Sequence, residues 1–576
     1  MRANTHYRPP RDAAVDAAVA ESGHAPENLL PVLQRAQSER GYLDPPVVQA
    51  AAGALGVSQA QAFGVASFYS MLATRPRAAR VVRVCDGPVC MACGAAGLQA
   101  GIAAACDANE WAVERTSCLG LCDRAPAALV DDEPCGPIGT ENAGSIAEGW
   151  RGEAPSYAQP LPGEMRVKMA RVGRVDPESL DDALAHGAYR VLSAALRRPT
   201  DRVVFEVEES GLRGRGGAGF PTGRKMRLVA SQRASPKHVV CNADESEPAA
   251  FKDRVLLEGD PHLVLEGMAL AALAVRAESG IVYIRGEYET AARRLERAIA
   301  QAVEAGRLGR NIDGTSFSFT VHVHRGAGAY ICGEETALLE SLEGKRGEPR
   351  IRPPYPTVSG LHGLPTLVNN VETLCALPAI VERGGAWYRS LGTAGSAGTK
   401  LFTITGHVNR PGVVEVPFGV TLRQLIDQFG GGMRSGAKFH MALTGGAAGT
   451  LVGPDALDVA IDFDARHQGV SVGSGGMLVL DDSVRAAELL LWLLRFFEVE
   501  SCGKCTPCRE GTREARMLLE RLVTSGPAPG DGDRLRHLSR MLHATSLCGL
   551  GQSVALPIDS ALDRFAEEFG FDESRA

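Results

Sequence analysis

The stretch "KHVVCNADESEP", residues 237–248, is an apolar strand pattern that runs directly into a loop carrying three carboxylates. Two further apolar patterns, "SGIVYIRGE" (279–287) and "FSFTVHVHRGAGAY" (317–330), also end in Gly-rich or acidic loops. The segments that separate them, "HLVLEGMALAALAV" (262–275) and "YETAARRLERAIAQAVEAG" (288–306), have helical spacing. Strands that alternate with helices are typical of α/β domains, and we predict one over residues 165–395.

Four other regions flank this domain, which makes the chain a multidomain α/β protein. Residues 1–75 carry apolar residues at helical spacing, with Ser58 as an expected helix cap. Residues 76–150 begin with a strand, "RVVRVC" (80–85), which precedes a Gly/Pro loop and a helix expected to begin near Cys93. After a Pro- and Gly-rich linker (148–165) and the α/β domain come a small α+β domain (396–482) and a helical region (483–576). The α+β domain is expected to have strands at 399–408, 412–419 and 475–482 around one helix at 421–431.

The composition excludes several classes of protein. The chain has 576 residues, a net charge of −7 with mixed signs, and 14 cysteines that are grouped rather than evenly spread. Grouped thiols in a long chain are typical of metal ligands in a reducing compartment, whereas secreted disulfide scaffolds are small. We find no secretory signal, no basic tract and no apolar run long enough for a bilayer. We therefore expect a cytoplasmic protein without nucleic-acid or membrane partners.

The sequence "SCGKCTPCREG" (501–511) carries the densest group of thiols. Cys502, Cys505 and Cys508 form a C-x2-C-x2-C run, and Cys548 follows 40 residues later. Three closely spaced thiolates and one distant thiolate can hold the corners of a [4Fe–4S] cluster. Structural zinc sites more often pair two C-x2-C units, so the spacing favours iron–sulfur over zinc.

A second group allows two ligand assignments. Cys85, Cys90 and Cys93 spell the plant-ferredoxin run C-x4-C-x2-C, with Cys122 as a distant fourth ligand. The alternative set is Cys85, Cys90, Cys118 and Cys122, which leaves Cys93 as a packed helix residue. Both assignments predict a [2Fe–2S] cluster. The strand that leads into Cys85 and the helix near Cys93 favour the second.

A glycine loop, "ESGLRGRGGAGFPTGRKM" (209–226), is the other strong feature. Gly214, Gly216 and Gly219 match G-x-G-x-x-G, although the loop lacks the Lys-Ser/Thr ending of a Walker A motif. Its free backbone N–H groups and Lys225 can face an anion. Acidic residues at strand ends can bind ribose hydroxyls, and Asn369 and Asn370 can bind a flavin or phosphate. We therefore expect one cofactor cleft at the strand ends.

These motifs together resemble a known family. The segments 211–223, 241–248, 329–335, 364–374 and the C-terminal cysteine motif closely resemble the flavin- and NADH-binding subunit of the respiratory complex I family. The region from "FYSML" (68–72) to "SCLGLC" (117–122) resembles that family's small [2Fe–2S] subunit, a helical bundle followed by a thioredoxin-like domain. The domain at 396–482 is similar to the family's β-grasp soluble-ligand-binding domain.

The resemblance implies a Rossmann-like FMN and NAD domain with specific contacts. FMN would lie on the glycine loop, and the nicotinamide would stack on the flavin. Phe220 would pack on the adenine, and Glu247 and Glu335 would lie near the NADH ribose as the reaction's key carboxylates. The expected cofactor contacts are Gly214, Arg215, Gly216, Gly217, Ala218, Lys225, Asn242, Asp244, Glu245, Tyr330, Gly333, Glu334, Asn369 and Asn370. The chain departs from the family at Ala249–Ala250, where Gly–Thr is usual, and at Met226, where Trp is usual.

The fusion of both modules in one chain bears on function. Such fusions are common in cytoplasmic molybdenum or tungsten NAD-dependent formate dehydrogenases and in NAD-reducing hydrogenases. The intact N-terminal cysteine set favours the formate dehydrogenase β subunit, whose large partner subunit would carry the metal and further iron–sulfur clusters. The alternatives are a hydrogenase diaphorase chain, a complex I subunit and, more distantly, a non-catalytic iron–sulfur scaffold.

Overall fold

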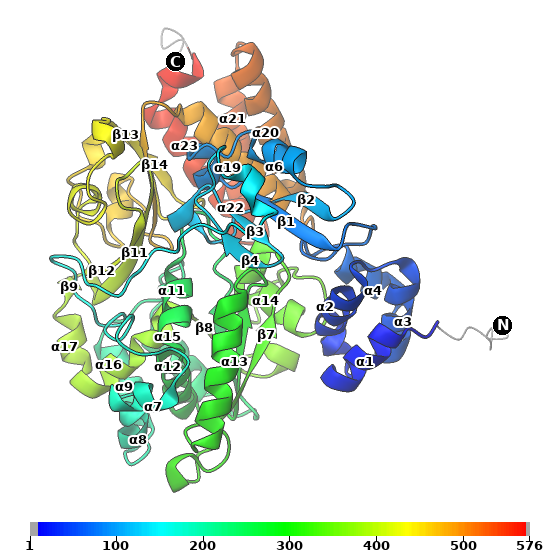
Figure 1. Cartoon of the computed structure of the whole chain (residues 1–576). Coiled ribbons are helices and arrows are strands. Elements are labelled where there is room, and N and C mark those ends of the chain that lie inside the picture. The colour runs from blue at the N-terminus through cyan, green and yellow to red at the C-terminus, as the bar shows by residue number, and fades with distance from the viewer. Residues whose placement is uncertain (1–9, 572–576) are drawn as a thin grey trace.

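The computed structural model describes residues 10–571, so the first nine residues of the predicted helical region and the last five of the chain lie outside it. The N-terminal domain is helical, with α1 (Ala13–Ser22), α2 (Leu29–Arg40), α3 (Pro45–Leu55) and α4 (Gln59–Ala66). The Ser58 hydroxyl accepts the Gln61 N–H at 3.1 Å, which confirms the expected cap of α4. In Figure 1 this domain and the β-grasp domain lie on opposite sides of the molecule.

The second domain is a four-stranded sheet in the order β2-β1-β3-β4. The strands are β1 (Arg80–Cys85), β2 (Trp111–Thr116), β3 (Ala128–Val130) and β4 (Glu133–Cys135), and the helices are α5 (Pro88–Ala92) and α6 (Leu98–Ala105). The prediction of a helix beginning near Cys93 was wrong, because α5 ends there. Pro88 starts α5 earlier, and Gly94 and Gly97, both with positive φ, separate α5 from α6.

The central α/β domain contains a parallel sheet in the order β7-β6-β5-β8. Its strands are β5 (His238–Ala243), β6 (Ser279–Ile284), β7 (Thr320–Arg325) and β8 (Thr366–Asn370). Because the strands are parallel, the acidic loop after β5 and the asparagines that end β8 meet at one edge. Its helices are α7 (Leu180–Ala185), α8 (Arg190–Ala195), α9 (Asp201–Glu209), α10 (Thr222–Ala230), α11 (Lys252–Gly259), α12 (Pro261–Val275), α13 (Glu289–Glu304), α14 (Glu335–Leu342), α15 (Val371–Cys375), α16 (Leu377–Arg383) and α17 (Gly385–Arg389).

The β-grasp domain has a five-stranded sheet in the order β12-β11-β15-β13-β14 and its own apolar core. Its strands are β11 (Thr399–Gly406), β12 (Gly412–Pro417), β13 (Phe439–Thr444), β14 (Thr450–Val452) and β15 (Gly476–Asp481), preceded by the short pair β9 (Gly392–Thr393) and β10 (Ser396–Ala397). The three expected strands are confirmed, whereas β13 and β14 were not predicted. The expected helix is α18 (Leu422–Gln424), which continues as a π-helical turn over Leu425–Phe429.

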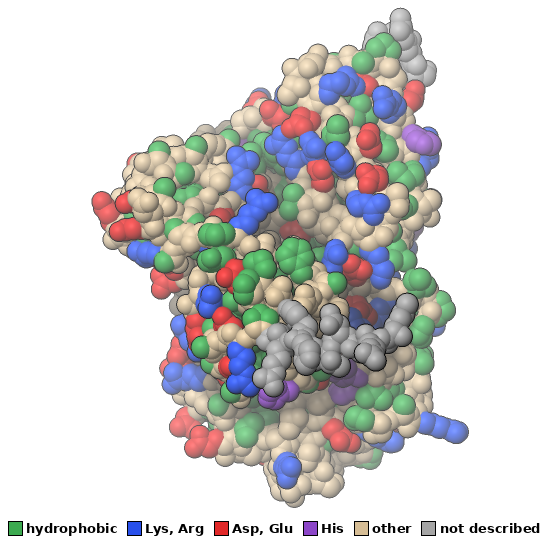
Figure 2. Space-filling model, turned by 90° about the vertical axis from the view of Figure 1, so that its right-hand side faces the viewer, with side chains coloured by type: hydrophobic (Ala, Val, Ile, Leu, Met, Phe, Trp, Pro, Cys, Tyr) green, Lys and Arg blue, Asp and Glu red, His purple; other side chains and the backbone are tan. Residues whose placement is uncertain are grey.

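The C-terminal region is helical, as expected. It comprises α19 (Ala486–Glu500), α20 (Thr506–Ser525), α21 (Asp531–Thr545), α22 (Gly549–Ser553) and α23 (Ala555–Arg564). Within residues 10–571 there is no helix with the length and apolar character needed to cross a membrane. Charged side chains of both signs are interspersed over the face shown in Figure 2, in agreement with the mixed charge of the sequence.

A buried ion network joins the α/β and β-grasp domains. The Lys400 ammonium lies 2.6 Å from the Glu372 carboxylate, and Lys168 lies 3.1 Å from Glu415 and 3.5 Å from Glu372, all with fully buried side chains. The surrounding lysines lower the pKa of Glu372 to about 2 despite its burial. Removing one partner from such a network leaves an uncompensated buried charge, so these contacts fix the β-grasp domain against the α/β domain.

The loop after β5 contains a strained residue, and its strain can be tested. Ala249 is fully buried and has φ +70, a left-handed conformation that costs a non-glycine residue about 1–2 kcal/mol. Glycine would remove this cost but lose about 0.5–1 kcal/mol of chain entropy. We therefore expect Ala249→Gly to raise the thermal unfolding midpoint by about 1–3 °C. The neighbouring variant Ala250→Gly should lower it, and a drop in both would contradict the assigned strain.

Candidate functional site

A cavity of about 390 Å³ lies where the α/β, β-grasp and C-terminal domains meet. The glycine loop, the loop after β5, the turn that precedes α14 and the end of β8 form its α/β walls. The sequence-predicted residues that line it are Gly216, Gly217, Ala218, Asn242, Asp244, Glu245, Glu247, Tyr330, Gly333, Glu334 and Asn370. Residues from outside the α/β domain also line it, namely Ala448, Ser474, Gly549, Leu550 and Ser553. The expected single cleft at the strand ends is thus present.

The glycine loop presents open backbone to the cavity. Gly217 has φ +131, and no atom of the described chain lies within 4 Å of the position where its Cβ would stand. A Cβ on Gly216 would approach the Asn370 Cβ to 3.0 Å, so this glycine packs closely against the end of β8. A cavity wall of unobstructed backbone fits a phosphate group, because peptide N–H groups can approach its oxygens without a side chain between them.

Six predicted contacts do not line this cavity. The Gly214 N–H donates to the Phe220 carbonyl at 2.9 Å, and Asn369 is buried. The buried Arg215 guanidinium donates to the carbonyls of Arg213, Thr399 and Ala397. The Lys225 ammonium donates to Glu335 at 2.7 Å and to the Val368 carbonyl at 2.9 Å. Phe220 is 43% exposed.

The carboxylates of the cavity differ in their surroundings. Glu245 accepts the Asp253 and Arg254 N–H groups at 3.0 Å, so it caps the start of α11. Glu247 accepts the Tyr330 hydroxyl at 2.5 Å and the Ala448 N–H at 2.8 Å, and burial raises its pKa. Glu247 is therefore held by hydrogen bonds that involve two domains, with its carboxylate at the cavity wall.

Asp244 gives the apoprotein a testable pH dependence. Burial raises its pKa from 3.8 to about 7, so the folded chain keeps this proton over a range in which the unfolded chain loses it. The stability that Asp244 contributes is present below about pH 4 and is lost as the pH rises to about 7. We expect Asp244→Asn to reduce the loss of apoprotein stability between pH 5 and 8, measured by denaturant unfolding. Asp458→Asn, at an exposed ion pair, is the control, and an unchanged pH dependence in Asp244→Asn would refute the assignment.

Sequence reasoning missed several residues of the cavity. Lys252 lines it with a buried ammonium 2.8 Å from Asp253 and 3.4 Å from Glu372. Ala448 and Ser474 come from loops of the β-grasp domain, far from the motifs in the sequence. Lys252 belongs to the run "FKDR", which follows the acidic loop and places charged residues on the first turn of a helix. This pattern is the sequence feature from which Lys252 could have been predicted as a site residue.

The cysteines of the C-terminal motif converge on one small cavity. Cys502 and Cys505 lie between α19 and α20, Cys508 lies in the first turn of α20, and Cys548 directly precedes α22. All four line this cavity. Burial raises the pKa of Cys508 to about 12 and that of Cys548 to about 11. Ile331 and Leu550 line both this cavity and the larger one, so the two sites share a wall.

The N-terminal cysteines form a second buried group. The Cys118 and Cys122 sulfurs are 3.5 Å apart, and the Cys90 thiol interacts electrostatically with Cys85, Cys118 and Cys122. Cys93 lies instead near Arg434, and burial raises its pKa to about 11. Across residues 10–571 all cysteines are free, and no three His, Cys, Asp or Glu side chains are placed to hold a single metal ion. Each iron of a cluster takes only one or two of the thiolates, so three or more of them need not converge on one point.

The loop after β5 connects this cysteine group with the cavity. Glu247 faces the cavity, while the backbone N–H of Ala249, two residues on, interacts with the Cys122 thiol and favours its thiolate form. Arg285 donates to the carbonyls of Cys118 and Glu245 at 2.5 Å each. The C-terminal cysteine group therefore shares a wall with the central cavity, whereas the N-terminal group is linked to it through Arg285, which also binds the carbonyl of the cavity residue Glu245.

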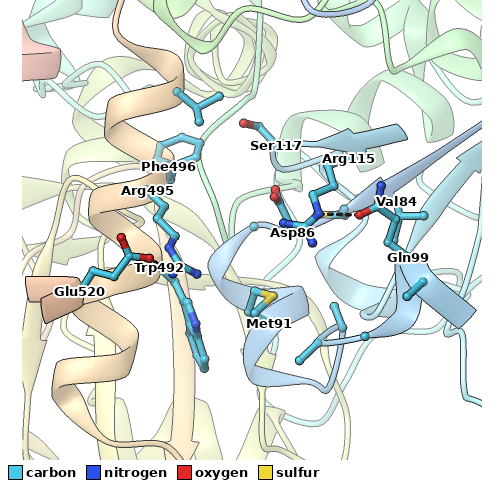
Figure 3. Close-up of a pocket in the computed structure, with 17 residues that line it drawn as sticks. Val84, Asp86, Met91, Gln99, Arg115, Ser117, Trp492, Arg495, Phe496 and Glu520 are labelled. Carbon is cyan, nitrogen blue, oxygen red and sulfur yellow. Dashed lines mark hydrogen bonds and ion pairs between the residues drawn. The ribbon is translucent and has the colours of Figure 1, made fainter. Parts of the chain in front are cut away.

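Another cavity, of about 530 Å³, separates the N-terminal cysteine group from α19. Figure 3 shows Asp86, Met91 and Arg115 on one side of it and Trp492, Arg495 and Phe496 on the other. Cys85 lines it as well, and Arg495 is paired with Glu520 of α20 at 2.7 Å. The interface between the domain of residues 76–150 and the C-terminal helices is therefore not fully packed, because it contains this cavity.

Four family models match successive parts of the chain. They are the Nuo51 FMN-binding domain at 207–379, the thioredoxin-like [2Fe-2S] ferredoxin at 15–151, the NADH-ubiquinone oxidoreductase-F iron-sulfur binding region at 488–571 and the SLBB domain at 401–450. The chain therefore carries an FMN-binding domain of an NADH-binding family, a [2Fe–2S] domain and a 4Fe–4S domain. These findings confirm the expected cofactors.

Individual relatives agree with these matches. The chain is 47% identical over 405 residues to the F 2 subunit of NADH-quinone oxidoreductase from Rhizobium meliloti, covering 70% of this chain and 96% of the relative. It is 46% identical over 407 residues to the NADP-reducing hydrogenase subunit HndC of Solidesulfovibrio fructosivorans, covering 70% and 83%. A chain in a crystal structure of an NAD+-reducing [NiFe]-hydrogenase matches with a TM-score of 0.82 and 32% identity, covering 95% of this chain and 94% of that chain.

The matched family supports an NAD-dependent oxidoreductase module, and the relatives are named as subunits of larger enzymes. The resemblance seen in the motifs is thereby confirmed over both modules. The chain belongs to the family of FMN-binding NADH-quinone oxidoreductase subunits, with a thioredoxin-like [2Fe–2S] ferredoxin domain joined to its N-terminal side.

Proposed function

We propose that this chain is the diaphorase subunit of a cytoplasmic NAD-linked enzyme, and that it exchanges a hydride with NAD(H) and single electrons with two iron–sulfur clusters. FMN supplies the conversion between two-electron and one-electron chemistry when it is bound. The observation that carries the proposal is one cavity that shares a wall with the C-terminal cysteine group and is linked to the N-terminal group through Arg285. A non-catalytic scaffold would need no such cavity between them.

Different residues of the chain bind the flavin and the nicotinamide nucleotide. The open backbone of Gly216, Gly217 and Ala218 receives the FMN phosphate, and Asn242, Asp244, Glu245, Tyr330, Gly333, Glu334 and Asn370 surround the rest of the flavin. Lys225 and Glu335, paired with each other, border the nucleotide region with Phe220. Glu247 binds a ribose of NAD(H), which orients the nicotinamide toward the flavin.

The cluster ligands follow from the two cysteine groups. Cys502, Cys505, Cys508 and Cys548 bind the [4Fe–4S] cluster, because all four line one small cavity. Cys85, Cys90, Cys118 and Cys122 bind the [2Fe–2S] cluster, because they contact one another while Cys93 lies near Arg434. The backbone N–H of Ala249 supports the second site by favouring the thiolate form of Cys122.

The partner is a large subunit in which the electron donor is oxidised. The fused arrangement is common to formate dehydrogenases and hydrogenases, and the complete N-terminal cysteine set supports a molybdenum or tungsten formate dehydrogenase subunit. A hydrogenase subunit is the second candidate, since the matching [NiFe]-hydrogenase chain covers 95% of this chain. Metal analysis of the native complex separates the two. We expect molybdenum or tungsten, and nickel in the large subunit would overturn the formate assignment in favour of hydrogenase.

Expression of the chain without partners tests the division of labour. The isolated chain should oxidise NADH with ferricyanide or a viologen as acceptor. It should not reduce NAD+ with formate or hydrogen, because the proposal places those reactions in the partner. Formate- or hydrogen-dependent NAD+ reduction by the isolated chain would contradict this division, and failure to oxidise NADH with FMN bound would contradict the diaphorase proposal itself.

A further inference from the structure

The turn between β13 and β14 of the β-grasp domain reaches into the central cavity. This turn, residues 445–449, has the sequence Gly-Gly-Ala-Ala-Gly. The Ala448 N–H donates to Glu247 Oε1 at 2.8 Å, and Ala448 also lines the cavity. The other carboxylate oxygen, Oε2, accepts the Tyr330 hydroxyl of the α/β domain at 2.5 Å. Glu247 is thus held by groups from two domains, and 201 residues separate it from Ala448 in the chain.

Gly446 allows the close approach of this turn to Glu247. It has φ +90, and a Cβ at this position would lie 2.4 Å from Glu247 Cγ and 2.7 Å from Oε1. Separations this short are strongly repulsive between heavy atoms, so any side chain at 446 would displace the Glu247 carboxylate. The backbone of the turn cannot easily yield, because the Gly445 and Gly446 N–H groups both donate to the Gly476 carbonyl, at 2.8 and 3.0 Å.

The β-grasp domain is itself fixed to the loop that carries Glu247. The Thr403 hydroxyl of β11 donates to the Ala249 carbonyl at 2.5 Å, two residues after Glu247. The Lys400 ammonium, also on β11, binds Glu372 at 2.6 Å and the Ser474 carbonyl at 2.8 Å. Ser474 lines the same cavity. Contacts to the Glu247 carboxylate and to Ala249 just after it therefore couple the position of the carboxylate to the β-grasp sheet.

We propose that the β-grasp domain is a structural part of the nicotinamide-nucleotide site, in which Gly446 and the Ala448 N–H act as positioning groups for Glu247. The proposal rests on the function proposed above, in which Glu247 binds a ribose diol. Two hydrogen bonds, one to each oxygen, fix the plane of the carboxylate and leave a lone pair on each oxygen for the diol. The domain then sets the affinity for the nucleotide through Glu247.

Gly446→Ala in the holoprotein tests the proposal, with Gly436→Ala as a matched control. Gly436 lies in the same domain with φ +69, and no described atom lies within 4 Å of its Cβ position, so it reproduces the backbone strain without the clash. We expect Gly446→Ala to raise KM for NADH at least tenfold and to weaken ADP-ribose binding in calorimetry by a similar factor. FMN content and kcat should stay near those of the unmodified protein, and Gly436→Ala should change none of these quantities.

The double variant with Glu247→Gln distinguishes positioning from general damage. If Gly446 acts through Glu247, the double variant should match Glu247→Gln alone, because the two effects are not additive. Additive losses, or equal KM values in Gly446→Ala and Gly436→Ala, would overturn the positioning role. A Glu247→Gln variant with unchanged KM would instead refute the ribose role of Glu247 in the proposed function.

Discussion

Cys118→Ser should abolish or strongly distort the EPR signal of the reduced [2Fe–2S] cluster, whereas Cys93→Ser should leave it in place. The Cys118 sulfur lies 3.5 Å from that of Cys122, and the hydrogen bond with Cys122, together with Arg285, lowers its pKa and favours the thiolate. Cys93 lies at the end of α5 near Arg434, where burial raises its pKa to about 11. Serine replaces a soft thiolate ligand with a poorer donor, so we expect the cluster to be lost or distorted.

Iron analysis is the matched control for this pair of variants. The unmodified chain and Cys93→Ser should both contain about six iron atoms, the sum of a [2Fe–2S] and a [4Fe–4S] cluster, with no stoichiometric zinc. Cys118→Ser should retain about four. The reverse pattern, with the signal lost in Cys93→Ser and kept in Cys118→Ser, would show that the plant-ferredoxin ligand set is the right one.

Glu247→Gln should raise KM for NADH by about 10- to 100-fold while FMN content stays the same. Hydrogen bonds from neutral donors to a charged acceptor contribute about 1.5–3 kcal/mol, and each 1.4 kcal/mol corresponds to about a factor of ten. The amide keeps the size of the side chain but loses the charge that a ribose diol would bind. FMN content, measured after release from the protein, controls for damage to the flavin part of the cavity.

The pH dependence of KM gives this variant a second signature. Burial raises the pKa of Glu247, so its carboxylate is protonated at a higher pH than an ordinary glutamate. NADH affinity should therefore weaken as the pH falls through that raised pKa. The ionised carboxylate offers only acceptors to the ribose hydroxyls, whereas the protonated carboxyl group carries a donor in place of one acceptor. Glu247→Gln should lack this dependence. Full NADH affinity in the variant at neutral pH would remove Glu247 from the nucleotide site.

The sequence predicted the parts of the fold that depend on local pattern. β5, β6 and β7 are apolar runs that end at loop signals, and Ser58 is a cap because of its position before a helical pattern. β8 and the β13–β14 pair were not identified. β8 is a short run that ends in two asparagines, and β13 and β14 are joined by a glycine-rich turn that gives little periodic signal. Tertiary pairing rather than local preference makes these segments strands.

Some residues of the site could likewise be predicted from local sequence, whereas others depend on contacts between distant parts of the chain. Cysteine spacing identified both thiol groups, and the structure separates Cys93 from the others through the break between α5 and α6. The pairing of Lys225 with Glu335 could not be read from the sequence, because 110 residues separate them. The same holds for Ala448, which reaches Glu247 only because the β-grasp domain is fixed against the α/β domain.

The central claim is that one chain converts hydride equivalents into single electrons, and rapid mixing tests it most directly. The oxidised, isolated chain is mixed anaerobically with NADH, and flavin absorbance and freeze-quenched EPR spectra are followed together. The account predicts that flavin absorbance falls as NADH is consumed and that the signal of a reduced iron–sulfur cluster then appears within the time of one turnover. NADH consumption without any reduced-cluster signal, or no loss of flavin absorbance at all, would contradict it.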